Sequence, residues 1–137
     1  PTPGPVWIEA DALLLEHLIN NLVSNALDWA QQGKARPQVQ VQVTVDADQH
    51  LAGLVVSDSG PGVNEEDQAH IFNAFVSLKE GGMGMGLAIC RSITEAHHGS
   101  IGVERDAHLG GARFTVWLPL AKGPSTPRPS VFFQSPE

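Results

Sequence analysis

A long amphipathic segment, residues 11–32, limits the possible folds more than any other part of the chain. Asp11 is a suitable helix cap, the periodic pattern runs to Gln32, and Gly33 is a typical stop signal. At about 100° per residue, the apolar side chains of this helix form one continuous arc. They are Leu14, Leu15, Leu18, Ile19, Leu22, Val23, Ala26, Trp29 and Ala30. An arc this wide needs a large apolar partner, and we expect it to face a sheet.

Alternating apolar and polar residues predict strands elsewhere in the chain. The predicted strands cover residues 6–9, 39–45, 51–58, 100–105 and 112–118. The remaining predicted helices are a short one capped by Asn64 and a long one from Leu87 to His98, closed by Gly99. Strands and helices do not alternate one by one in this order, which disfavours a Rossmann fold. We expect an α/β two-layer sandwich, in which a mixed sheet of about five strands carries its helices on one face.

The 137 residues are enough for one domain with a single core. We assign residues 6–120 to that domain and residues 1–5, which are rich in Pro and Gly, to a linker. Residues 121–137 form a proline-rich tail that we expect to be disordered, although Phe132 and Phe133 could dock on the domain.

The charge balance excludes several classes of function. The chain has 8 Lys and Arg against 15 Asp and Glu, a formal net charge of −7. A chain this acidic lacks the clustered cations that bind nucleic acid or an acidic membrane surface. Apolar runs fall short of the roughly 18 residues that a membrane span requires, so we expect no direct membrane contact. The single cysteine, Cys90, excludes an internal disulfide and is best explained as a buried apolar side chain.

Asn25 lies inside the apolar arc of the first helix, between Leu14 and Leu18, with Asn21 and Asp28 near the edge of that arc. A buried amide without a partner costs about 1–3 kcal/mol, so a polar group must approach this face. Two interpretations remain open. Asn25 either bonds to main chain inside the core, or lines a pocket that receives a ligand or its metal ion.

Asp58 ends an apolar, central strand and is followed by Ser59, Gly60, Pro61 and Gly62. The glycines let a planar ligand lie close to the backbone. A carboxylate at this place could accept a hydrogen bond from an exocyclic amine such as that of adenine. The alternative is an ordinary Asp-Ser-Gly turn without a ligand.

A second glycine-rich stretch, residues 81–87, opens directly into a helix. Free amides and the positive end of the dipole make such a helix start suitable for phosphate. The stretch is not a P-loop, because no Gly-Lys-Ser/Thr follows. It also lacks the preceding strand of a dinucleotide-binding fingerprint.

These segments together resemble a known family. Four of them match, in order, the N, G1, F and G2 boxes of sensor histidine kinases: residues 21–28 (NLVSNALD), 58–62 (DSGPG), 71–75 (IFNAF) and 82–87 (GMGMGL). The C-terminal segments 95–101 and 111–119 also fit. The resemblance covers residues 5–120 and implies the catalytic ATP-binding domain of a two-component sensor kinase. Its fold would be the Bergerat ATP-binding fold, shared by gyrase, Hsp90-type chaperones and MutL-type proteins.

The resemblance implies a role for each box in binding Mg²⁺-ATP. Asn25 would ligate the Mg²⁺ that bridges the phosphates, and Asp58 would accept a hydrogen bond from the adenine amine. Backbone amides of the G2 box would hold the phosphates, while Phe72 and Phe75 would anchor the base of the ATP lid. Lys79 in that lid either reaches a phosphate or is solvated, so no catalytic residue is assigned. The implied ATP-binding residues are Asn21, Asn25, Asp28, Asp58, Gly60, Gly62, Phe72, Phe75, Lys79, Gly82, Gly84, Met85, Gly86 and Leu87.

Three residues depart from the pattern of the family. The G2 box usually has a small residue or Thr at Met83 and Leu at Met85, and two flexible thioethers there could loosen the lid. We expect binding to survive, because backbone amides make the phosphate contacts. Asp28 replaces a lysine of some members, which removes one possible phosphate contact.

Asn21 occupies the position where ATP-hydrolysing relatives have a glutamate that activates water. An amide cannot serve as that general base. We therefore expect transfer of the γ-phosphoryl group to a histidine on a separate dimerisation and phosphoacceptor domain of the same protein. We expect this chain to lack the acceptor histidine. His50, His70 and His108 lie in no helix-borne His-Glu acceptor pattern, His17 has a structural or surface role, and His97 and His98 lie at the end of a helix.

The resemblance further implies a downstream response regulator as a partner and a cytoplasmic location. Three alternatives remain. One is an ATPase of the gyrase and Hsp90 type, which Asn21 disfavours. Another is a nucleotide-sensing module without phosphotransfer, supported only by Met83 and Met85. The last is a domain that only binds other proteins.

Overall fold

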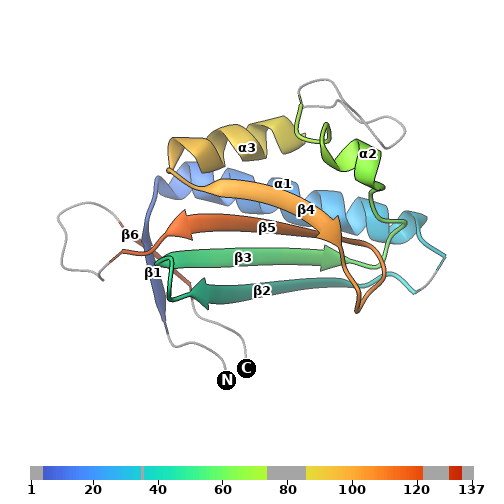
Figure 1. Ribbon diagram of the computed structural model, residues 1–137, viewed down its shortest axis with the longest axis horizontal. Coiled ribbons are helices and arrows are strands. Elements are labelled where there is room, and N and C mark those ends of the chain that lie inside the picture. The colour runs from blue at the N-terminus through green and yellow to red at the C-terminus, as the bar shows by residue number, and fades with distance from the viewer. Residues whose placement is uncertain (1–4, 35, 74–85, 122–129, 134–137) are drawn as a thin grey trace.

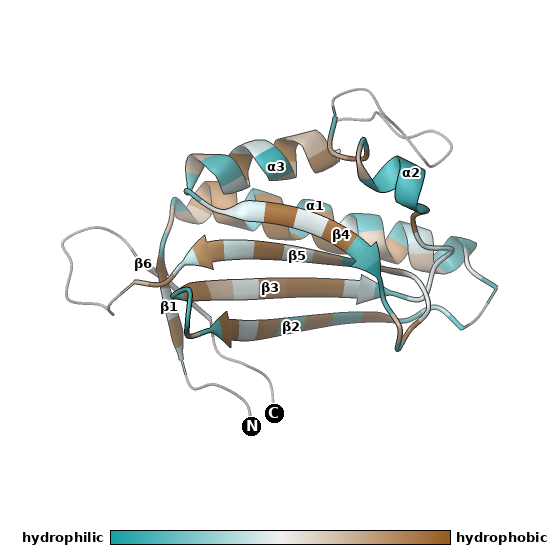
Figure 2. Cartoon of the chain, viewed as in Figure 1, coloured by the Kyte–Doolittle hydropathy of each residue, from teal (hydrophilic) through white to brown (hydrophobic). Residues whose placement is uncertain are grey.

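Four antiparallel strands form the main sheet of the computed structural model, which describes residues 5–34, 36–73, 86–121 and 130–133. In spatial order they are β2 (Val39–Asp46), β3 (Leu51–Asp58), β5 (Ala112–Pro119) and β4 (Ser100–Arg105). Two long helices, α1 (Ala12–Gln32) and α3 (Gly86–Ala96), lie together on one face of this sheet (Figure 1). The short helix α2 (Glu65–Gln68) lies beyond one end of the sheet and is hydrophilic throughout (Figure 2). The predicted two-layer sandwich is confirmed.

The predicted mixed sheet is wrong in strand direction, since every described pairing is antiparallel. β2 and β3 are joined by a short turn, as are β4 and β5, and antiparallel neighbours are what short connections produce. The helices between β3 and β4 carry the chain back, so these two strands run in the same direction. β5 lies between them, and they therefore do not pair.

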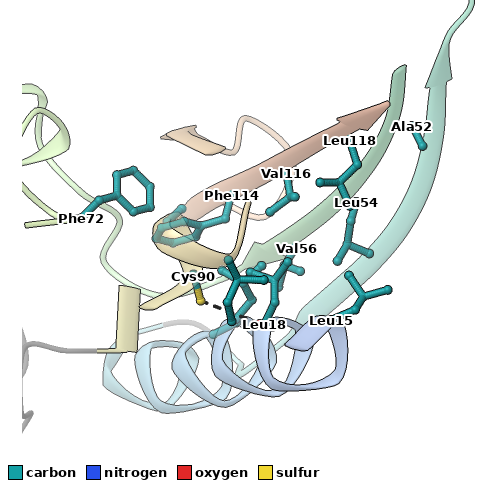
Figure 3. Packing of buried hydrophobic residues seen from close by; sticks show 14 of the residues in the cluster. Leu15, Leu18, Ala52, Leu54, Val56, Phe72, Cys90, Phe114, Val116 and Leu118 are labelled. Carbon is teal, nitrogen blue, oxygen red and sulfur yellow. Dashed lines mark hydrogen bonds between the residues drawn. The ribbon is translucent and has the colours of Figure 1, made fainter. Parts of the chain in front are cut away.

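The core lies between the sheet and the two long helices. Alternate side chains of β3 and β5 point toward the helices, including Leu54, Val56, Phe114 and Val116, and meet Leu18 of α1 (Figure 3). Cys90 of α3 is fully buried among them, as predicted, and its thiol donates to the Leu18 carbonyl oxygen at 3.8 Å. The Phe114 ring also contacts Trp29 of α1, with ring centroids 5.8 Å apart.

The predicted ends of α1 are confirmed. The Asp11 carboxylate accepts from the backbone N–H of Leu14 at 3.0 Å, and Gly33 terminates the helix by donating to the Ala30 carbonyl at 3.3 Å. A carboxylate at the cap satisfies one of the free amides of the first turn and also suits the helix dipole.

His97 joins the end of α3 to the start of α1. Its Nδ1 lies 2.8 Å from the Ile93 carbonyl oxygen, and its Nε2 accepts from the backbone N–H of Asp11 at 3.0 Å. Since a carbonyl can only accept, Nδ1 is the donor of the bond to Ile93. The two long helices are therefore fixed to each other at this end.

The end of α3 differs from the prediction. The helix stops at Ala96, and the residue in the left-handed region is His98, with φ of 63°, instead of Gly99. Gly99 donates to the Thr94 carbonyl at 2.9 Å, which is the bond of a Schellman motif. A Cβ at Gly99 would lie 2.1 Å from the Trp117 carbonyl oxygen, so glycine is required by contact with β5.

Part of the tail forms a strand. β6 (Ser130–Phe133) pairs antiparallel with β1 (Val6–Glu9), so the expected disorder of residues 121–137 is wrong for these four. The edge of β1 offers unpaired backbone groups, and a second strand satisfies them despite the proline-rich composition. Within the described part of the chain, no helix is long and apolar enough to cross a membrane.

Candidate functional site

Two carboxamides of α1, those of Asn21 and Asn25, have buried nitrogen atoms, and Asn21 lies near the start of α3. Asn25 is 9% exposed, and its Nδ2 is buried without a hydrogen-bond partner among the described residues. The Nδ2 of Asn21, one turn earlier, is also buried without a hydrogen-bond partner among the described residues. A Cβ at Gly86, the first residue of α3, would lie 3.8 Å from Asn21 Oδ1. The amide nitrogen of Asn25 is thus not satisfied by described main chain, which favours the interpretation that this face receives a ligand.

Asp58 ends β3 with a fully buried side chain whose two oxygens are in different situations. Oδ1 accepts from the backbone N–H of Gly60 at 2.9 Å and from that of Ala112 at 3.2 Å. Oδ2 is buried with no partner in the described parts of the chain. The Asp-Ser-Gly turn considered above is therefore present, but it uses only Oδ1 and leaves the other oxygen available to a donor.

The environment of Asp58 makes its ionisation less favourable. Burial raises the pKa of this carboxyl above its ordinary value of 3.8, and it is the largest effect. The hydrogen bonds from Gly60 and Ala112 lower the pKa, because they stabilise the charged form. The negative charge of Asp106 raises the pKa further, and the net shift is upward.

Main-chain contacts fix the loop that follows Asp58. A Cβ at Gly60 would lie 2.4 Å from the Trp29 carbonyl oxygen, and one at Gly111 would lie 2.3 Å from the Asp58 carbonyl oxygen. Gly62 has φ of 80°, a conformation that side-chain-bearing residues rarely adopt. The loop is therefore held between the last turns of α1 and the turn before β5.

The predicted motifs converge on α1. Gly60 lies against the carbonyl of Trp29, and Gly86 lies against the side chain of Asn21. Asn25 is one helical turn from each of these positions. The glycine after β3, the glycine that opens α3 and the buried amides therefore border the same stretch of one helix.

The other predicted site residues are divided between the core, the surface and the undescribed segments. Phe72 is buried and meets the Phe114 ring edge-on, with centroids 6.0 Å apart and planes at 88°. Leu87 packs against the core, and Asp28 is exposed on α1. Phe75, Lys79, Gly82, Gly84 and Met85 lie outside the described residues.

Sequence reasoning missed the turn between β4 and β5. Asp106 is buried there, and Gly111 donates to the Asp58 carbonyl at 3.1 Å. The signal that could have found it is an aspartate between a strand and a Gly-Gly pair, a composition typical of a turn with a side-chain bond to its own backbone.

The donor set suits a magnesium ion held together with a phosphate ligand. Mg²⁺ is usually bound by one or two protein oxygens plus substrate phosphates and water, and an asparagine oxygen is a suitable ligand. Asn25 presents such a carboxamide oxygen, and its buried, unsatisfied Nδ2 is a donor that suits a phosphate oxygen beside the ion. Across the described residues, no three His, Cys, Asp or Glu side chains gather into a metal-binding group of their own.

Comparison with known proteins identifies the family to which this fold and site belong. The profile of the histidine kinase-, DNA gyrase B- and HSP90-like ATPases matches residues 10–122. The chain belongs to this family. Within it, the chain is similar to the catalytic ATP-binding domains of two-component sensor histidine kinases, as the sequence motifs predict.

Two curated relatives illustrate the similarity. The C4-dicarboxylate transport sensor protein DctS of Rhodobacter capsulatus is 39% identical over 115 residues, covering 82% of this chain and 17% of the relative. The sensor histidine kinase CpxA of Escherichia coli K12 is 36% identical over 126 residues, covering 88% of this chain and 26% of the relative. The chain thus spans about a quarter or less of the relatives it matches.

Solved structures of sensor histidine kinases are also similar to this chain. The mycobacterial sensor histidine kinase MprB superimposes with a TM-score of 0.75 at 26% identity, covering 87% of this chain and 80% of that one. Full-length ShkA in complex with AMPPNP gives a TM-score of 0.67 at 32% identity, covering 80% of this chain and 22% of that one.

Proposed function

We propose that this domain binds Mg²⁺-ATP and donates its γ-phosphoryl group to a histidine on a separate dimerisation and phosphoacceptor domain of the same protein. A response regulator would receive the group next. The observation that carries the proposal is the pair of buried, unsatisfied carboxamide nitrogens of Asn21 and Asn25, of which Asn21 lies near the first residue of α3. Family membership supports nucleotide binding and a kinase catalytic domain. We also propose a cytoplasmic location for the domain.

Asp58 would select the base. Its Oδ2 is a buried acceptor without a described partner, and the exocyclic amine of adenine is a donor of the right kind. Leaving a buried acceptor unpaired costs about 1–3 kcal/mol, so a base that presents a donor there is favoured over one that presents an acceptor. Gly60 and Gly62 would shape this end of the pocket by keeping main chain in place of side chains.

Asn25 would hold the metal ion through its carboxamide oxygen, with Asn21 and Asp28 nearby. Mg²⁺, when bound, neutralises charge on the phosphates. Gly86 and Leu87 begin α3, where free backbone amides suit phosphate oxygens. Contacts from Phe72, Phe75, Lys79, Gly82, Gly84 and Met85 remain predictions from the family pattern.

Asn21 favours transfer over hydrolysis. An amide side chain cannot take a proton from water, so the described site lacks the base that ATP-hydrolysing relatives use at this position. In the proposed reaction, an imidazole nitrogen of the acceptor forms a bond to the γ-phosphorus while the bond to the bridging oxygen breaks. ADP leaves with that oxygen, and the imidazole proton passes to solvent. The domain contributes by positioning and electrostatics.

Labelled ATP tests the proposal in the protein that contains both this domain and its acceptor domain. The γ-phosphate should appear on a histidine of the acceptor domain as an acid-labile label, and Asn25→Ala should abolish it. Rapid release of inorganic phosphate without labelling would instead indicate an ATPase. Tight ATP binding with neither product would indicate a nucleotide-sensing module.

A further inference from the structure

Asp106, which directly follows β4, is a buried carboxylate with no part in the proposed function. Its side chain is 5% exposed, and Oδ2 accepts from the backbone N–H of Leu109 at 2.6 Å. Its main chain closes the same turn, because its carbonyl accepts from Gly110 at 2.8 Å and its amide donates to Gly111 at 2.7 Å. These three bonds define the path of the chain from β4 to β5.

The turn that Asp106 closes delivers two backbone amides to Asp58. Gly111 donates to the Asp58 carbonyl at 3.1 Å, and Ala112 donates to Asp58 Oδ1 at 3.2 Å. A Cβ at Gly111 would lie 2.3 Å from Asp58 Oδ1, so main chain of the turn rests directly on the carboxylate. The orientation of Asp58 therefore depends on how this turn is held.

We propose that Asp106 is a positioning residue for base selection. By fixing the turn, it keeps the Ala112 amide on Asp58 Oδ1 and leaves Oδ2 directed at the incoming base. The inference rests on the proposed function, in which Oδ2 accepts from the adenine amine. A freed Asp58 would turn either oxygen toward solvent or toward the loop, and its preference for an amine donor would fall.

Nucleotides that differ at the amine edge of the base give the most direct test. ATP carries an exocyclic amine and an unprotonated N1, whereas ITP carries a carbonyl oxygen and a proton on N1, so the ratio of their dissociation constants reports on the base edge that Asp58 is proposed to bind. Asp106→Ala should weaken ATP binding by about tenfold, the equivalent of one buried hydrogen bond, and ITP binding by less than about twofold. A general loss of structure would weaken both nucleotides by the same factor.

Two further variants sharpen the test. Asp106→Asn keeps an oxygen that can accept from Leu109, so the ATP to ITP ratio should stay close to that of the wild type. Glu104→Ala is the matched control, because Glu104 pairs with Arg113 at 3.0 Å across the same two strands on the exposed side of the sheet. It should leave both dissociation constants unchanged.

The pH profile supplies a readout that a purely structural role would not move. Because the charge of Asp106 raises the pKa of Asp58, Asp106→Asn should lower the pH at which the preference for ATP over ITP is lost. If Asp106→Ala does not fold, the pH profile of Asp106→Asn tests the proposed role of Asp106.

Equal weakening of ATP and ITP in a folded Asp106→Ala domain, or an unchanged pH profile in Asp106→Asn, would overturn the inference. Asp58→Asn separates its failure from that of the proposed function. If Asp58→Asn leaves the ATP to ITP ratio unchanged, the assigned role of Asp58 itself is wrong. If Asp58→Asn abolishes the preference for ATP over ITP and Asp106→Ala does not, only the role of Asp106 is wrong.

Discussion

Gly60 and Trp29 touch through main chain alone, since a Cβ at Gly60 would lie 2.4 Å from the Trp29 carbonyl oxygen. This contact ties the loop after β3 to the last turns of α1. Asp58 and the amides of Asn21 and Asn25 are carried by these two elements, so their relative position depends on it. A site built across two elements needs such a rigid joint to keep its geometry.

Gly60→Ala should therefore destabilise the domain and weaken nucleotide binding together. Forcing a methyl group into backbone contact typically costs about 1–3 kcal/mol, which unfolding in denaturant would measure. Gly102→Ala is the matched control, because a Cβ at Gly102 meets no atom within 4 Å. If the Gly60→Ala domain is as stable as the wild type, the loop can move away from α1 and the joint is not rigid.

Asn25→Leu should stabilise the free domain and abolish its response to nucleotide. Removing a buried amide with an unsatisfied nitrogen should raise the free energy of unfolding by about 1–2 kcal/mol. At about 100 times Kd, Mg²⁺-ATP should stabilise the wild type by about 2.7 kcal/mol and the variant not at all.

Asn20→Leu makes the same change at an exposed position of α1 and should keep the full response to nucleotide. If the free Asn25→Leu domain is less stable than the wild type, the view that the Asn25 amide is kept for a ligand is contradicted.

Stability should depend on pH through Asp58. The pKa of Asp58 is raised in the folded state above the ordinary value of 3.8, so the folded state binds more protons just above that pH. The free energy of unfolding should therefore fall as the pH rises from 3.8 through the raised pKa, because the buried carboxylate becomes charged. Asp58→Asn should lack this decrease.

ATP affinity should increase as the pH rises from 3.8 through the raised pKa of Asp58, because the ionised carboxylate is the better hydrogen-bond acceptor. Denaturation curves and ATP-binding isotherms of the wild type and of Asp58→Asn across the acid range would measure both pH dependences. Parallel curves for Asp58→Asn and the wild type would contradict the assignment.

Cys90 should be unreactive until the domain unfolds. Burial raises the pKa of its thiol to about 12, and the thiolate is the reactive form. A maleimide at neutral pH should label the folded domain orders of magnitude more slowly than the denatured chain, with a rate that follows the unfolding transition. Labelling of the folded domain at the rate of a free thiol would mean that α3 separates from α1.

Elements that depend on local sequence could be predicted. The start of α1 at Asp11, its stop at Gly33 and the strand from Leu51 to Asp58 follow from capping residues and from apolar spacing. The position of Asn25 within the apolar arc also follows from helical periodicity, and so does its burial. These features depend only on neighbours within a few turns.

Features set by distant contacts could not be predicted in this way. Gly99 is typical of a helix stop, but it is required by the Trp117 carbonyl on another strand. The pairing of β6 with β1 joins the two ends of the chain and overrides a composition typical of disorder. Asp106 acts on Asp58 from a distant part of the sequence, and only the pairing of β3 with β5 brings the two together.

The most direct test of the central claim is a crystal structure of the domain with Mg²⁺ and AMPPNP. We predict that the adenine amine donates to Asp58 Oδ2 and that the carboxamide oxygen of Asn25 ligates the metal ion. A structure in which the Asn25 amide turns inward to main chain while the nucleotide binds elsewhere, or does not bind, would contradict the account.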